Sequence, residues 1–288
     1  MFHNQPKIKI VECPRDAMQG WKTFIPTQHK VDYLNCLLEV GFDTLDCGSF
    51  VSPKAIPQMA DTKEVLSKLD LGNSKTKLLV IVANLRGAEE AVLFKQVYYL
   101  GFPFSISETF QQRNTNSSIA ESLERVEAIQ QLCFKHHKEL VVYLSMGFGN
   151  PYGDAYSEEI LLYWANEIVS RGTRIISLAD TVGLATPQQI TIALQTLLPK
   201  YPQVAFGVHL HSSPHNWQYK LEAALQAGCR RLDGAINGIG GCPMAGDALV
   251  GNMNTELMID YLQPYNYNTS LDMDALVKAF GLAQTTFV

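Results

Sequence analysis

Short β-rich runs alternate with longer amphipathic runs along almost the whole chain. Eight runs have the pattern of buried strands: residues 7–11, 44–47, 77–83, 103–107, 141–145, 174–178, 204–209 and 231–235. Seven runs have helical periodicity: residues 28–40, 53–69, 119–137, 158–170, 187–198, 217–227 and 255–262. Strands that alternate with helices of this length predict βαβ units and a parallel sheet. Eight strands in roughly 240 residues is the number that closes a (β/α)8 TIM barrel of the α/β class.

Glycine and proline positions agree with this interpretation. A glycine follows a helical run and precedes a strand at four places, and a proline begins a helical run at two: Gly41, Gly101, Gly172 and Gly228, and Pro53 and Pro187. Glycine is favoured just beyond a helix C-terminus, and proline in the first helical turn. An open doubly wound sheet is the alternative fold, but no G-x-G-x-x-G follows the first strand.

No low-complexity linker divides the 288 residues. We therefore expect one barrel domain over residues 1–265, which is within the usual size of this fold. Residues 266–288 have a helical pattern without a ninth strand. They are predicted to form a short helical extension packed on the barrel.

Composition excludes several classes of protein. The chain is 47% hydrophobic and 18% charged, with a net charge of −5 and no lysine- or arginine-rich block. It therefore lacks the basic footprint of a nucleic-acid or anionic-membrane binder, and no apolar run approaches the ~20 residues that span a bilayer. The six cysteines are scattered without a C-x-x-C pair, as in proteins of reducing compartments. We expect a cytoplasmic protein with no targeting segment before residue 7.

Charged, imidazole and hydroxyl side chains gather where the predicted strands end. They are Arg15, Asp16, Asp46, Ser49, Glu108, Asp180, His209 and His211. The carboxyl ends of barrel strands form one rim, which carries the catalytic groups in enzymes of this fold. The sequence therefore predicts an active site on that rim.

The segment His209-Leu210-His211 is the sharpest local signal. Residues i and i+2 of a strand point to the same face, so both imidazoles can reach one ion. A pair of hydrogen-bonded histidines at a strand end is the alternative. A carboxylate from Asp16 and an amide oxygen from Asn252 would complete a mixed nitrogen and oxygen set. Such a set suits Mg²⁺ or Mn²⁺, and also Zn²⁺.

Two further motifs leave alternatives open. Arg15-Asp16 is either a salt bridge at the barrel mouth, or a metal ligand beside a cation that stabilises an oxyanion. The glycine-rich loop at residues 238–243 is either a tight turn with an incidental Cys242, or a mobile lid that brings this thiol to the site as a proton donor or acceptor.

These residues resemble the 3-hydroxy-3-methylglutaryl-CoA lyase family of metal-dependent carbon–carbon lyase and synthase barrels. The matching stretches are residues 11–19, 49–61, 105–110, 177–183, 209–211 and 238–243, and their order and spacing hold over nearly the whole chain. The stretches Ser-Phe-Val-Ser-Pro-Lys and Gly-Gly-Cys-Pro are specific to the lyases within this superfamily.

The resemblance implies cleavage of the C2–C3 bond of an acyl-CoA to give acetoacetate and acetyl-CoA, as in leucine breakdown or ketone-body formation. Matched position by position, it implies metal ligands at Asp16, His209, His211 and Asn252 and catalytic roles for Arg15, Asp46 and Cys242. Cys242 or His209 would handle the proton that ends on the acetyl group. We also expect a set of residues around the substrate or behind the metal ligands: Gln19, Lys22, Ser49, Glu108, Asp180, Gly240 and Gly241. The family usually forms dimers, so a homodimer is expected.

A few positions depart from the family pattern. Asp46 stands where the lyases carry glutamate, Ser212 follows the histidine pair in place of aspartate, and Met244 replaces an aromatic residue. These changes lie around the substrate, so a related aldolase or Claisen-type synthase with another hydroxy-acyl or keto-acid substrate is the alternative. A non-catalytic metal-binding barrel is the other alternative, which the intact ligand set opposes.

Overall fold

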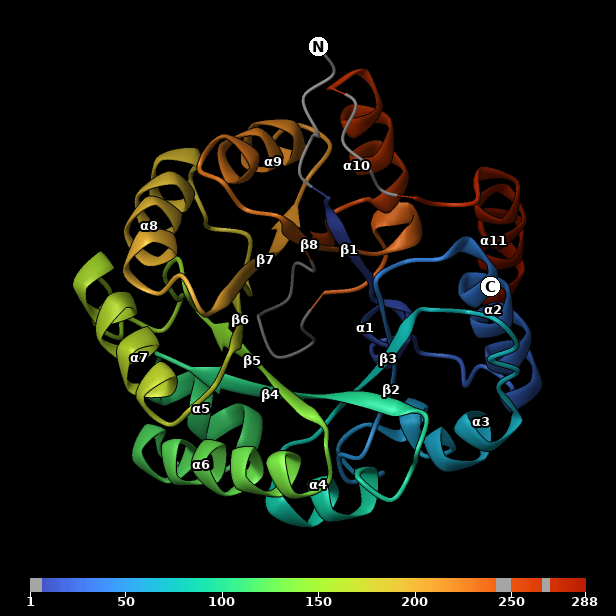
Figure 1. Ribbon diagram of the computed structural model, residues 1–288, viewed down its shortest axis with the longest axis horizontal. Helices are drawn as coiled ribbons and strands as arrows, with labels where there is room; N and C mark the ends of the chain where they lie inside the picture. Colours follow the sequence, from blue (N-terminus) through green and yellow to red (C-terminus); the bar gives the residue numbers. More distant parts are fainter. Residues whose placement is uncertain (1–6, 242–249, 266–269) are drawn as a thin grey trace.

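The structure is a computed structural model that describes residues 7–241, 250–265 and 270–288. Its centre is a barrel of parallel strands surrounded by helices (Figure 1). The strands are β1 (Lys9–Glu12), β2 (Thr44–Ser49), β3 (Lys77–Ile81), β4 (Val97–Ser105), β5 (Glu139–Ser145), β6 (Ile175–Asp180), β7 (Ala205–Ser212) and β8 (Arg231–Gly234). Each pairs with its sequence neighbour, and β8 pairs with β1, which closes the barrel. The predicted TIM barrel is confirmed.

One longer helix follows each strand. These helices are α2 (Thr27–Val40), α3 (Thr62–Lys68), α4 (Leu85–Ala91), α6 (Ile119–Lys135), α7 (Glu158–Ser170), α8 (Pro187–Lys200), α9 (Trp217–Gln226) and α10 (Thr255–Leu262). Local chemistry fixes where several of them begin. Ser118 with Glu121, and Thr186 with Gln189, form capping boxes that satisfy the first free N–H groups of α6 and α8.

Shorter elements lie at the ends of the barrel. The helices α1 (Pro14–Gln19) and α5 (Glu108–Thr115) directly follow β1 and β4, and three 3₁₀ turns are present: η1 (Pro57–Met59), η2 (Ile236–Gly238) and η3 (Gln263–Tyr265). The two-residue strand β9 (Gly251–Asn252) pairs antiparallel with the end of β7. Apart from η3, these elements lie at the carboxyl ends of the strands, where the site was predicted.

Alternating side chains divide the core into two layers. Leu79, Ile81, Val141 and Tyr143 point into the barrel, where they form a small apolar cluster with Tyr99 and Ile175. The residues between them, such as Val80 and Val142, face the helices and belong to the larger cluster. The two-residue period of a strand produces this division. The barrel is therefore packed with side chains below the site, and is not a channel.

Two of the predictions made from glycine and proline positions were wrong. Gly101 lies inside β4 and does not end a helix; a Cβ there would come within 2.6 Å of Ile81 Cδ1, so the barrel interior has no room for a side chain. Pro53 begins a turn, and the helical structure starts only at Pro57 and Thr62. Gly41, Gly172 and Gly228 have the positive φ expected just past a helix.

The C-terminal helix α11 (Met273–Thr286) packs against α2 on the outside of the barrel (Figure 1). Cys36 of α2 lies against Ala275 there, with its thiol 3.8 Å from the carbonyl oxygen. The helical extension is thus present, while the division of the chain after residue 265 stays a prediction. None of the described helices is long and apolar enough to cross a membrane.

Candidate active site and metal centre

A short helix places two predicted residues directly after the carboxyl end of β1. Pro14 begins α1 immediately after β1, at a position where its missing N–H costs nothing. Arg15 and Asp16 follow in the first turn and are both buried. Burial of two charged side chains at a strand end requires paired partners nearby.

Arg15 has such partners on two elements. Its Nε lies 3.2 and 3.0 Å from the two carboxylate oxygens of Asp46, and its Nη2 donates to Asp46 Oδ2 at 2.5 Å. Its Nη1 donates to Asp16 at 3.0 Å and to Gln19 Oε1 at 2.9 Å. Asp46 therefore reaches Arg15 although it is one methylene shorter than the glutamate of the family pattern.

The same arrangement leaves Arg15 one free donor. A guanidinium carries five N–H groups, and the described partners use one on Nε, two on Nη1 and one on Nη2. The remaining N–H of Nη2 is available to a substrate oxygen, since Arg15 lines the cavity described below. Asp46 and Asp16 also hold the guanidinium plane in a fixed orientation.

Asp16, His209 and His211 form a buried group whose potential ligand atoms lie within 4.8 Å of one another. Two imidazoles and a carboxylate are a common set for Zn²⁺ or Mn²⁺, and suit Mg²⁺ when substrate and water add oxygens. The Nδ1 atom of His211 is buried and has no hydrogen-bond partner among the described residues. An unpaired buried lone pair costs free energy that a cation would recover, so these residues fit a divalent metal.

Asn252 joins this group through Asp16. Strand β9 pairs it with His211, and its Nδ2 donates to Asp16 Oδ2 at 2.8 Å and to the Ile239 carbonyl at 2.9 Å. In this orientation its amide nitrogen, and not its oxygen, faces Asp16. Gly240 packs so closely that a Cβ would lie 2.5 Å from Nδ2, which explains why a glycine is needed there.

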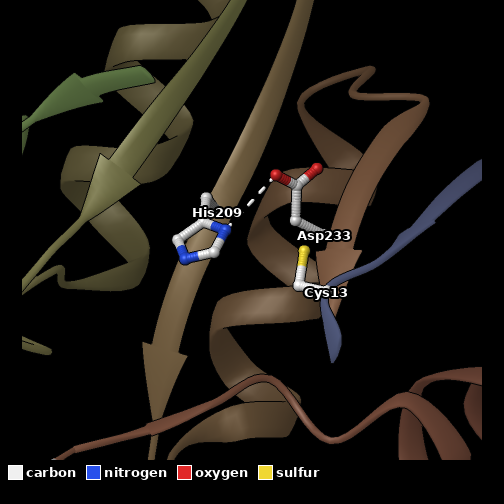
Figure 2. Close-up of side chains that lie close together, drawn as sticks. All are labelled: Cys13, His209 and Asp233. Atoms are coloured by element: carbon white, nitrogen blue, oxygen red, sulfur yellow. Dashed lines mark hydrogen bonds and ion pairs between the residues drawn. The ribbon is translucent and has the colours of Figure 1, made fainter. Parts of the chain in front are cut away.

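His209 has a second partner below the rim. Figure 2 shows its Nδ1 turned toward Asp233 of β8, at 3.3 Å from Oδ2, with Cys13 nearby, directly after the end of β1. Cys13, His209 and Asp233 have the spacing of a metal group as well. However, burial and the surrounding carboxylates raise the pKa of Cys13 far above its usual range, so its thiol stays neutral. Asp233 is also bound by Arg231, so we interpret these residues as support for His209.

The environment sets different charges on His211 and Asp16. Burial lowers the pKa of His211 to about 4, with the neighbouring His209 adding to the effect. Burial alone would raise the pKa of Asp16, but Arg15 and the two histidines outweigh it and lower the value to about 2. A neutral imidazole beside an ionised carboxylate at neutral pH is the state that binds a cation.

His209 and Asp46 also shift. Burial alone would lower the pKa of His209, but the hydrogen bond and charge of Asp233 raise it overall. Burial raises the pKa of Asp46 to about 6, and the Arg15 charge offsets part of that effect. Perturbed values in a concave site are typical of functional groups.

Arg15, Asp16, His209 and His211 line a cavity of about 420 Å³. Its walls come from the ends of most strands: Arg15, Asp16, Gln19, Val51, Ala55, Ile56, Ile81, Ala83, Pro103, Phe110, Arg113, Asn114, Thr115, Tyr143, Ser145, Ala179, Thr181, His209 and His211. The cavity combines these polar groups with a mostly apolar lining. A small polar acyl group with an apolar tail is the kind of ligand that such a cavity accommodates.

Several predicted site residues lie elsewhere. Ser49 is buried under its own loop, where its hydroxyl accepts from Val51 N. Glu108 accepts from Ile119 N at the start of α6, and Lys22 is exposed outside the cavity. Gly241 is described, with a φ of +131°, whereas Cys242 lies outside the described residues. The lid role of Cys242 therefore stays a prediction.

Asp180 supports the site from behind. Its carboxylate accepts from Lys220 Nζ at 2.6 Å, and the same amine donates to the carbonyl oxygens of His211 at 2.8 Å and Gly183 at 3.0 Å. Lys220 is buried in the middle of α9. This amine ties α9 to the backbone of a proposed metal ligand.

Sequence reasoning missed Asp233, Lys220 and Tyr143. Asp233 alternates with Arg231 on β8, so the inward-facing pair was visible as an i, i+2 pattern. Lys220 falls beside Leu221 on the apolar face of its helix, which is an unusual place for a lysine. Tyr143 stacks edge-on against His209 with ring centroids 5.7 Å apart, and nothing in the sequence distinguishes it from a core tyrosine.

Comparison with known proteins agrees with this geometry. A family model described as HMGL-like matches residues 7–282. The chain belongs to the HMGL-like family. This finding confirms the family resemblance over nearly the full length of the chain.

Curated members of the HMGL-like family are similar along most of their length. The cytoplasmic 3-hydroxy-3-methylglutaryl-CoA lyase of Rattus norvegicus is 34% identical over 275 residues, which cover 94% of this chain and 79% of the relative. The mitochondrial hydroxymethylglutaryl-CoA lyase of Homo sapiens is 33% identical over 276 residues, covering 95% and 83%.

Solved structures of the family have the same architecture. An HMG-CoA lyase from Acinetobacter baumannii, in complex with coenzyme A and 3-methylmalate, superposes with a TM-score of 0.91 at 29% identity, covering 100% of this chain and 93% of that one. The hydroxymethylglutaryl-CoA lyase of Pseudomonas aeruginosa gives a TM-score of 0.89 at 30% identity, covering 98% and 93%.

Proposed function

We propose that this protein is a carbon–carbon lyase that cleaves 3-hydroxy-3-methylglutaryl-CoA to acetoacetate and acetyl-CoA with a divalent metal. The observation that carries the proposal is that Arg15, Asp16, His209 and His211 meet in one cavity. Family membership supports it, because the relatives named above are lyases for this substrate.

Asp16, His209 and His211 would hold Mg²⁺ or Mn²⁺, with Asn252 joining them after rotation of its amide. Rotation would turn the Asn252 oxygen toward Asp16, which is favourable only when a cation lies near both. A bound divalent metal would polarise the hydroxyl and carbonyl oxygens of the substrate and ease loss of the hydroxyl proton. Zn²⁺ is compatible with the same three residues.

The reaction breaks the C2–C3 bond and needs two proton transfers, one from the C3 hydroxyl and one to C2. Loss of the C3 hydroxyl proton lets the C3–O electrons form a ketone while the C2–C3 bond breaks, so the electron pair passes to the thioester as an enolate. Arg15 would direct its free Nη2–H at that developing oxyanion, and Asp46 would keep the guanidinium in place. A proton delivered to C2 then completes acetyl-CoA, and Cys242 and His209 are the proposed participants.

The cavity volume of about 420 Å³ agrees with a site for the acyl group and the adjoining part of the pantetheine arm. The nucleotide end of an acyl-CoA would lie outside this space. Apolar residues such as Val51, Ile56 and Phe110 would contact the arm. We propose no nucleic-acid or membrane partner.

Release of acetyl-CoA from 3-hydroxy-3-methylglutaryl-CoA tests the proposal. Purified protein would be assayed with Mg²⁺ or Mn²⁺ and then with an excess of chelator. Metal-dependent release supports the lyase activity and makes Asp46 an accepted substitute for glutamate. If folded, metal-loaded protein releases none, a panel of other hydroxy-acyl-CoA and keto-acid substrates would identify the sister reaction.

The cellular compartment and the oligomeric state are proposed from the cysteines and from the family resemblance. The five cysteines within the described residues are buried free thiols, which agrees with a reducing compartment such as the cytoplasm. Relatives of the chain include both cytoplasmic and mitochondrial proteins. A homodimer is proposed from the family resemblance. Sedimentation of the purified protein would distinguish a dimer from a monomer.

A further inference from the structure

Asp233 lies where its carboxylate can determine which ring nitrogen of His209 is free to bind a metal. Strands β7 and β8 are paired so that His209 lies directly beside Asp233 in the register. Both side chains point into the barrel, and His209 Nδ1 lies 3.3 Å from Asp233 Oδ2 (Figure 2). The backbone register, and not a mobile loop, therefore brings the two side chains together.

The chemistry of this contact selects one imidazole tautomer. An ionised carboxylate only accepts hydrogen bonds, so His209 Nδ1 must carry the proton. The lone pair then lies on Nε2, on the side of the ring away from Asp233. His209 lines the cavity beside Asp16 and His211, which is where a metal would need that lone pair.

Asp233 is itself held in place. Arg231, two residues earlier on the same strand, donates from Nη1 to Asp233 Oδ1 at 3.0 Å. Ser177 of β6 donates to Oδ2 at 3.4 Å. The carboxylate of Asp233 is completely buried, so the Arg231 charge is what keeps an anion stable at this depth.

The ring of His211 has a different environment from that of His209. Its Nδ1 is buried without a hydrogen-bond partner among the described residues, and none of the described carboxylates pairs with its ring. Of the two histidines, only His209 is oriented by an anion. The neighbouring Tyr143 ring packs edge-on against His209 and limits its rotation further.

We propose that Asp233, held by Arg231, is a positioning residue that fixes His209 in the Nδ1–H tautomer and thereby sets the affinity of the site for its divalent metal. The inference rests on the proposed function only in taking His209 as a metal ligand. Carboxylates behind metal-binding histidines typically change metal affinity about 10–100-fold when they are removed.

The direct test is the tautomer of His209 in metal-free protein. Long-range ¹H–¹⁵N correlation spectra distinguish Nδ1–H from Nε2–H imidazole, and His209 is assigned by comparison with His209→Gln. We expect Nδ1–H in the unsubstituted protein. In Asp233→Asn, the amide can donate to Nδ1, so we expect Nε2–H. An Nε2–H tautomer in the unsubstituted protein would overturn the proposal even if the variant failed to fold.

The second test is Mn²⁺ binding by titration calorimetry, which needs no substrate. Asp233→Asn should weaken Mn²⁺ binding about 10–100-fold, and Asp233→Glu should recover part of the loss. Glu12→Gln is the matched control, because Glu12 is equally buried on β1 but hydrogen-bonds to Ile236 and Thr255 instead of His209. Equal Mn²⁺ affinity in folded Asp233→Asn and unsubstituted protein would overturn the inference. Absence of lyase activity with intact Mn²⁺ binding would instead count against the proposed function alone.

Discussion

Both carboxylate oxygens of Asp46 accept hydrogen bonds from Arg15, at 2.5 to 3.2 Å, and join β2 to α1. The pair is buried, so neither charge is screened by water. The other donors of Arg15 are engaged, one N–H of Nη2 has no partner among the described residues, and Arg15 lines the cavity. The pair therefore serves both the stability of the barrel mouth and the proposed oxyanion contact.

Arg15→Gln should lower kcat about 10²–10³-fold, because one preorganised donor to the enolate oxygen is lost. Removal of one partner of a buried pair also leaves Asp46 uncompensated, at a cost of about 3–5 kcal/mol. The double variant Arg15→Gln/Asp46→Asn removes both charges, so stability to urea should recover while activity stays low. Arg86→Gln on the surface is the control, with both properties unchanged. Full activity in Arg15→Gln would favour a non-catalytic barrel.

His211→Ala should abolish most Mn²⁺ binding, by about 100-fold or more, since it removes a ligand and not a supporting group. The exposed His215 lies four residues on, and His215→Ala should bind Mn²⁺ normally. Titration calorimetry measures both affinities. Because a ligand that binds only the folded state stabilises it, saturating Mn²⁺ should raise the Tm of His215→Ala but not that of His211→Ala. An equal rise in both variants would contradict the ligand role of His211.

The sequence allowed the barrel and much of its rim to be predicted, because both depend on local periodicity. The strand period of two places His209 and His211 on one face, and the position of Arg15-Asp16 after the first strand places them on the same rim. Three of these four side chains lie in one potential metal group, and the fourth contacts it. Their roles in binding and catalysis stay predictions until they are measured.

Features that depend on contacts between distant strands were not predictable. Gly101 has the sequence context of a helix end, but the Ile81 and Tyr143 side chains inside the barrel exclude any Cβ there. Asp180 was predicted to lie around the substrate or behind the metal ligands, but its partner, a lysine 40 residues later in the chain, was not predicted. A single sequence does not reveal which of several buried charges will be partners, because that choice depends on strand register.

Lys220 links α9 to the site, and this link can be measured by a double-mutant cycle. Lys220→Met should destabilise the protein by about 3–5 kcal/mol, because it leaves the buried Asp180 charge unpaired. Asp180→Asn in the Lys220→Met background should recover much of this loss. Urea unfolding of the four proteins gives the coupling free energy. Additive effects of the two substitutions would show that the pair is not a coupled unit.

The carboxyl group of Glu12, in the barrel wall, is a further buried group with a shifted pKa. Its side chain is completely buried, and it accepts from Ile236 N at 2.8 Å and from Thr255 Oγ1 at 2.6 Å. Burial raises the pKa of Glu12 to about 8, although both hydrogen bonds offset part of the effect. A protonated Glu12 remains satisfied, because the Thr255 hydroxyl can accept a hydrogen bond as readily as donate one.

This shift predicts how stability depends on pH. Between the ordinary glutamate pKa near 4.5 and the folded value of about 8, the folded state holds a proton that the unfolded state has lost. Glu12 therefore contributes stability fully below pH 4.5, and the contribution falls by at most about 1.4 kcal/mol per pH unit up to pH 8. Glu12→Gln cannot titrate, so the free energy of unfolding of the variant relative to the unsubstituted protein should rise from pH 5 to pH 8 and then level off. The exposed Glu89→Gln should show a constant difference over the same series of urea titrations. A constant difference for Glu12→Gln as well would mean that Glu12 is ionised in the folded barrel at pH 5.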